Sequence, residues 1–173
     1  MTIIVYKDGV LASDSAAVTG MSITYITYHQ KVELSKCKRF AWGTSGAVID
    51  PIYLEEFQRL MLIYLINCRS FGSEKPMCKE LFKILKGRDM IIMTLDTVYV
   101  CQRTETSLTL VKLLEGEFAA VGTGRILATA ALLKGKTADQ ATQFAIEHDF
   151  YSYRSKVLTI KRKSLKQLPV EIK

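Results

Sequence analysis

The sequence opens with the stretch TIIVYKDGVLASDS, residues 2–15, which decides how the rest of the chain can fold. Its first half is rich in β-branched and aromatic residues, which favour a strand. Asp8-Gly9 is then a strong two-residue hairpin signal, because both residues tolerate positive φ. Residues 10–13 return as a second strand, so the chain begins with a tight β-hairpin.

This turn also determines which residues face each other across the hairpin. Lys7 pairs with Val10, and counting back places Ile3 opposite Asp14. Thr2 is thereby held at the end of a strand rather than in a loose tail. Because successive strand residues point to opposite faces, Asp14 should point away from the face that carries the Thr2 side chain. We therefore expect Asp14 to hold a basic partner rather than to contact the Thr2 hydroxyl directly.

The composition is that of one globular domain covering residues 1–173, with 49% hydrophobic and 24% charged residues. The longest apolar run, residues 60–66, is too short to span a membrane. The N-terminus shows no signal-peptide pattern, so we expect a cytoplasmic protein with no membrane association. The four cysteines form no C-x-x-C pair and have no histidine near them in the sequence, so we expect no metal site and no cofactor.

The net charge is +7, and the segment from Arg154 to the C-terminus carries seven basic residues against one acid, Glu171. Such a segment can meet nucleic acid or an acidic partner. The alternative is a solvated edge strand whose lysines block aggregation, and this is the interpretation we favour. The segment lacks the interleaved aromatic residues that stack on bases, so we do not expect nucleic acid to be a partner.

The remaining chain alternates between helix-like and strand-like segments. Asp50-Pro51 starts a long helix, because Asp can cap free amides and Pro is tolerated at the first helical position. Thr137 and Gln140 form a capping box that starts another helix. We expect strands within 21–35 and at 40–42, 90–101, 107–114, 118–121 and 157–160, helices at 77–86 and 126–133, and a break at 43–46. This order predicts an α+β fold in which two sheets pack face to face with helices outside.

Thr2 is the residue on which a chemical role would centre. A threonine is small enough that removal of the preceding Met1 is expected, and removal would give Thr2 a free α-amine. The reference pKa of that amine, about 7.7–8.0, lets it act as a base near neutral pH. Thr2 would then supply both a hydroxyl nucleophile and its base. Lys31 is a candidate partner, because a partly buried lysine near a threonine hydroxyl favours the alkoxide. A lone lysine is otherwise usually solvated.

Taken together, Thr2, the hairpin ending at Asp14 and the Lys31-Val32 pair resemble the N-terminal third of proteasome β subunits and, still more, the bacterial proteasome-like peptidases. The 41–47 turn followed by a long helix is similar to the family's oxyanion loop and first helix. Residues 118–124 resemble its Gly-Ser-Gly-Gly turn. The resemblance covers nearly the whole chain and implies a four-layer αββα sandwich of the N-terminal-nucleophile hydrolase type.

The resemblance also implies site residues and partners. Thr2 falls on the nucleophile, with Asp14 and Lys31 beside it, and the N–H of Gly43 would stabilise the oxyanion. Thr123, Asp149 and Ser152 would orient the α-amine. The implied site thus has seven residues: Thr2, Asp14, Lys31, Gly43, Thr123, Asp149 and Ser152. Relatives form closed rings gated by an ATP-driven unfoldase, so a homo-oligomer, such an unfoldase and a peptide or unfolded protein substrate are implied.

Several residues depart from the family pattern. Arg125 stands where the family's turn has its last glycine, and it would add bulk and charge near the site. The oxyanion glycine is ambiguous: Gly46 is an alternative to Gly43, and Trp42 could fall on the family glycine and obstruct substrate. If Met1 is retained, Thr2 has no free amine. Two hypotheses therefore stand, a threonine peptidase and a catalytically silent proteasome-like binding or scaffold protein.

Overall fold

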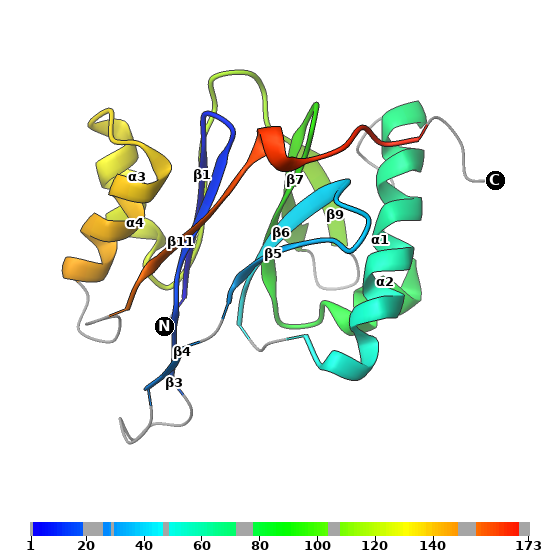
Figure 1. The fold of residues 1–173 in the computed structure, drawn as a ribbon, viewed down its shortest axis with the longest axis horizontal. Coiled ribbons are helices and arrows are strands. Elements are labelled where there is room, and N and C mark those ends of the chain that lie inside the picture. The colour runs from blue at the N-terminus through cyan, green and yellow to red at the C-terminus, as the bar shows by residue number, and fades with distance from the viewer. Residues whose placement is uncertain are drawn as a thin grey trace.

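The computed structural model describes residues 2–18, 26–28, 30–46, 49–71, 78–103, 108–148 and 155–169. Within these ranges the chain forms two large antiparallel sheets, a short β-ribbon and four α-helices (Figure 1). The strands of the first sheet, in spatial order, are β10 (Ala119–Gly122), β1 (Ile3–Lys7), β2 (Val10–Asp14) and β11 (Val157–Lys161).

The second sheet has five strands in the order of the sequence. They are β5 (Val32–Leu34), β6 (Phe40–Ser45), β7 (Asp89–Thr94), β8 (Val98–Arg103) and β9 (Leu108–Lys112). A two-stranded ribbon joins β3 (Ala16–Val18) to β4 (Ile26–Tyr28). The helices are α1 (Pro51–Phe71), α2 (Lys79–Ile84), α3 (Arg125–Leu133) and α4 (Ala138–Glu147), and a 3-10 turn covers Arg162–Ser164.

These elements stack in four layers, with α3 and α4 outside the first sheet and α1 and α2 outside the second (Figure 1). Three apolar clusters fill the spaces between the layers. Ile3 and Val5 pack toward α3 and α4. Ile4 and its neighbours lie between the two sheets. Phe57 and Met61 bury the inner face of α1 against the second sheet. The predicted αββα sandwich is confirmed.

The register predicted for the opening hairpin is confirmed. Lys7 pairs with Val10 and Ile4 with Ser13. Asp8 and Gly9 both have positive φ, 48° and 75°, as the predicted two-residue turn requires. The hairpin therefore brings Asp14 back beside the start of β1.

The predicted helix starts are also confirmed. Asp50 Oδ1 accepts a hydrogen bond of 3.0 Å from the N–H of Ile52 at the start of α1. Thr137 and Gln140 form the reciprocal capping box at the start of α4. Among the described helices, none combines the length and the apolar character that crossing a membrane demands.

Two strand predictions were wrong in their boundaries. The strand expected at 40–42 continues as β6 to Ser45, because Gly43 and Thr44 pair with β7 instead of breaking the sheet. The single strand expected at 90–101 is the hairpin β7–β8. Its turn is closed by hydrogen bonds between Thr94 and Thr97 and contains neither Gly nor Pro.

Candidate active site

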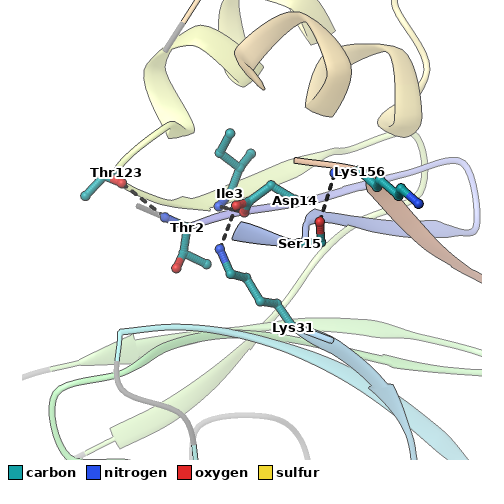
Figure 2. A network of polar contacts seen from close by, with 7 residues as sticks. All are labelled: Thr2, Ile3, Asp14, Ser15, Lys31, Thr123 and Lys156. Atoms are coloured by element: carbon teal, nitrogen blue, oxygen red, sulfur yellow. Dashed lines mark hydrogen bonds and ion pairs between the residues drawn. The ribbon is translucent and has the colours of Figure 1, made fainter. Parts of the chain in front are cut away.

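A buried ion pair joins the end of β2 to the residue before β5. Lys31 Nζ lies 2.6 Å from Asp14 Oδ2, and the side chains are 8% and 0% exposed. The first sheet contributes the carboxylate and the second sheet contributes the ammonium, so the pair bridges the two sheets (Figure 2). A charge this deeply buried is tolerated only when a partner compensates it. The contact expected between Asp14 and a basic partner is present.

The second oxygen of Asp14 holds the beginning of β1. Asp14 Oδ1 accepts a buried hydrogen bond of 2.7 Å from the backbone N–H of Ile3. This N–H belongs to the peptide bond that directly follows Thr2. Asp14 therefore positions both the lysine and the backbone at Thr2. The alternation of the hairpin did not predict the bond from the Ile3 N–H to Asp14.

Burial lowers the pKa of the Lys31 ammonium below its ordinary value, and the nearby Asp14 carboxylate offsets only part of that effect. Figure 2 shows the Thr2 side chain and the Lys31 amine on the same side of β1. The action of Lys31 on the Thr2 hydroxyl stays a prediction.

The turn after β10 holds the backbone nitrogen of Thr2. Thr2 N donates a hydrogen bond of 3.3 Å to Thr123 Oγ1 (Figure 2). This nitrogen is a peptide N–H while Met1 is attached, and it would become the α-amine if Met1 were removed. The sequence-predicted pairing of Thr123 with Thr2 N is thus present as a contact, and its role in orienting an amine stays a prediction.

Glycines allow this turn to approach Thr2 closely. A Cβ on Gly122 would lie 2.1 Å from the carbonyl oxygen of Thr2, and one on Gly124 would lie 2.3 Å from Ile3 Cγ1. Gly122 also has a φ of +94°, which disfavours other residues. The Gly-Thr-Gly pattern at 122–124 is the sequence signal for this close approach.

Arg125 follows this turn as the first residue of α3 and is exposed. Its Nη1 donates a hydrogen bond of 3.4 Å to the carbonyl oxygen of Gly122. The charge expected near the site is therefore directed at the backbone of the turn.

Gly43 lies inside β6 and faces the first sheet. A Cβ at this position would lie 2.4 Å from Ile4 Cγ2 and 3.1 Å from Val32 Cγ1. The N–H of Thr44 donates to the carbonyl of Lys31 at 3.2 Å, so alternation turns the Gly43 N–H toward β7. By the same alternation, the next N–H that points to the Lys31 side is that of Gly46. The oxyanion role of Gly43 stays a prediction, and the direction of the amides favours the alternative, Gly46.

Trp42 does not obstruct the site, so that expectation was wrong. Its side chain is 1% exposed and belongs to the cluster beneath α1. Its ring centroid lies 5.5 Å from that of Phe40 and 5.2 Å from that of Phe57. Alternation along β6 points Trp42 to the face opposite Gly43, away from the first sheet.

Two predicted site residues, Asp149 and Ser152, lie outside the described residues. The chain resumes at Ser155, and the N–H of Lys156 donates a hydrogen bond of 2.8 Å to Ser15 Oγ (Figure 2). Ser15 is 4% exposed and follows Asp14, so it ties the start of β11 to the site end of β2. Sequence reasoning did not single out this hydroxyl. In the described part of the chain, no three metal-binding side chains gather as a metal site requires.

No protein-family model and no curated protein matches the sequence. Solved structures do match. Eukaryotic HslV from Trypanosoma brucei superposes with a TM-score of 0.61 at 15% identity, covering 93% of this chain and 99% of that one. The chain has the fold of the proteasome-like peptidases. This proteasome-like fold also matches BPH of Thiobacillus denitrificans at 16% identity, in complex with epoxomicin (TM-score 0.58) and in a second structure (0.55), each covering 92% of this chain and 97% of that one.

Proposed function

We propose that this chain is an N-terminal-threonine peptidase that hydrolyses peptide bonds after Met1 has been removed. The observation that carries the proposal is the junction at Thr2: its nitrogen contacts Thr123 Oγ1, and the adjoining peptide N–H contacts the carboxylate that also holds Lys31. The proteasome-like fold supports it, because HslV is itself a peptidase of this fold.

In the proposed reaction, the Thr2 hydroxyl attacks the carbonyl carbon of a peptide bond, and its proton passes to the Thr2 α-amine. The positive charge of Lys31 stabilises the developing negative charge on Oγ, and Asp14 holds Lys31 in place. A backbone N–H of the 43–46 segment, from Gly43 or Gly46, stabilises the oxyanion.

The C–N bond of the substrate then breaks, and the leaving amine takes the proton from the Thr2 α-amine. The acyl group remains on Thr2 Oγ as an ester. Water attacks the ester carbon, the C–Oγ bond breaks, and the released acid leaves Thr2 with its hydroxyl restored. Thr123, Asp149 and Ser152 orient the α-amine in this scheme.

The same resemblance supplies the setting that we propose. Residues 1–173 form a single domain that self-associates into a ring or another homo-oligomer in the cytoplasm. An ATP-driven unfoldase delivers unfolded protein to it. No cofactor is required by the scheme, because Thr2 supplies both nucleophile and base.

Mass spectrometry of the purified protein tests this proposal. We expect an intact mass that lacks Met1 and, after treatment with epoxomicin, a single covalent adduct. The Thr2→Ala variant should give no adduct, and Thr159→Ala, which removes an exposed threonine on β11, should react like the wild type. Retained Met1 with no adduct would instead establish the catalytically silent alternative.

A further inference from the structure

The end of the sandwich opposite Thr2 carries a basic surface that the sequence does not show as one unit. Two separate segments form it: the tip of the β5–β6 hairpin and the C-terminal segment after β11 (Figure 1). The N–H of Lys166 donates to the carbonyl of Lys38 at 2.6 Å, and Arg39 Nη1 donates to the carbonyl of Gln167 at 2.9 Å. These bonds place the two basic segments side by side.

The C-terminal segment is fixed in place by its apolar residues. Leu165 is 6% exposed and packs between the two sheets, whereas Leu168 is 5% exposed and packs in the cluster beneath α1. The segment therefore crosses the end of the molecule from one apolar layer to the next. Its lysines are held on a structured surface rather than on a loose tail.

Four cations make up this basic end surface, namely Lys38, Arg39, Lys163 and Lys166. The three lysines are exposed and Arg39 is half-buried. No ion pair joins any of the four to an acid within the described ranges. Glu55 faces Lys36, and Asp96 accepts a hydrogen bond from Gln167. Asp8, Glu115 and Glu117 line the cavity beside Lys163.

The edge-strand interpretation of the basic segment explains only part of it. β11 ends at Lys161, and Lys163 and Lys166 lie beyond the strand. Arg162 is engaged elsewhere, because its Nη2 donates a hydrogen bond to the hydroxyl of Tyr6. Among the described residues, no ion pair engages the side chains of Lys38, Lys163 and Lys166, whereas Arg39 binds the carbonyl of Gln167 and keeps its charge exposed in part.

We propose that the basic end surface docks an acidic segment of a partner protein, rich in Asp and Glu. Charge complementarity supports this occupant, because four cations that form no ion pair among the described residues, held on a fixed surface, steer and hold a negatively charged chain. Nucleic acid fits less well. Tyr53, at the start of α1, is the one aromatic residue among the exposed large hydrophobic side chains of the described chain, and it is not part of the basic end surface. The surface therefore offers no aromatic ring for stacking bases.

Fluorescence anisotropy with the full chain tests the proposal. The probe is a labelled oligoglutamate peptide of about ten residues, compared with single-stranded and duplex DNA of similar length. The surface variant is Lys38→Glu/Lys163→Glu/Lys166→Glu. The control is Lys79→Glu/Lys86→Glu/Lys134→Glu, which changes the net charge equally at exposed lysines elsewhere.

We expect the wild type to bind the peptide in a salt-sensitive manner. The surface variant should lose about tenfold or more in affinity, and the control should lose less than about threefold. Thermal unfolding of both variants verifies that they are folded. The proposal is overturned if the wild type does not bind the peptide, if both variants lose affinity equally, or if DNA binds more tightly than the peptide.

Discussion

At the scale of single residues, Asp14 connects three parts of the chain. One carboxylate oxygen holds the Lys31 ammonium, and the other holds the backbone N–H of Ile3. Because both side chains of the ion pair are nearly inaccessible to water, removing one partner leaves the other as an uncompensated buried charge. The pair is therefore sensitive to substitution of either partner.

We predict that Asp14→Asn lowers the free energy of unfolding by about 3–5 kcal/mol, the usual cost of breaking a buried pair by removing one partner. Urea unfolding measures this. The double variant Asp14→Asn/Lys31→Met removes both charges and should recover most of the loss. A loss below about 1 kcal/mol in the single variant would show that the pair is not buried as described.

Glu33 gives a prediction for pH dependence. Burial raises the pKa of this carboxyl on β5 above its ordinary value. The folded protein thus binds the proton more tightly than the unfolded chain does. Stability from this group is present at low pH and is lost as the pH rises through the folded-state pKa. Glu33→Gln cannot ionise and should escape that loss.

The difference in Tm between Glu33→Gln and the wild type should therefore be more positive at neutral pH than at about pH 4. Thermal unfolding across this range checks the sign. Glu115→Gln, at an exposed position, is the matched control and should show a much smaller change with pH. A difference for Glu33→Gln that becomes more negative toward neutral pH would contradict the burial of this carboxyl.

At the scale of elements, the turn from β10 into α3 sets the position of Thr2. Gly122 combines a positive φ with a contact that leaves no room for a Cβ beside the Thr2 carbonyl. Gly135, after α3, has a φ of +82°, but a Cβ added there would meet no atom within 4 Å. A comparison of substitutions at the two glycines therefore separates the cost of backbone strain from the cost of steric contact.

We predict that Gly135→Ala costs about 1 kcal/mol in the free energy of unfolding, from backbone strain alone. Gly122→Ala should cost at least about 2 kcal/mol more, because the first residues of β1 must also move. Urea unfolding of the two variants makes the comparison. Equal losses would mean that the turn does not press against Thr2.

Sequence reasoning predicted some of the turns and strand boundaries correctly and failed at others. The Asp8-Gly9 turn has a strong local signal, so the hairpin and its register were predicted correctly. The β7–β8 turn is closed by Thr94 and Thr97, with no Gly or Pro to mark it, so it was read as continuous strand. Gly43 was read as a strand break, yet its missing Cβ makes room for Ile4 between the sheets.

At the scale of the whole molecule, the layered fold followed from the order of the elements, and nearly the whole length of the chain superposes on proteasome-like structures. Contacts between distant segments did not follow from that order. The bond from Lys156 to Ser15 and the joining of Lys38 to Lys166 depend on packing across about 130 or more residues. The contributions of Asp149 and Ser152 remain predictions.

In the proposed reaction, the buried lysine acts on the hydroxyl of Thr2. The rate of epoxomicin adduct formation, followed by intact mass in the wild type and in the folded Asp14→Asn/Lys31→Met variant, measures this action. We predict that the variant reacts about a hundredfold more slowly or worse, because the charge that stabilises the Thr2 alkoxide is gone. Reaction at a rate within about twofold of the wild type would contradict the account.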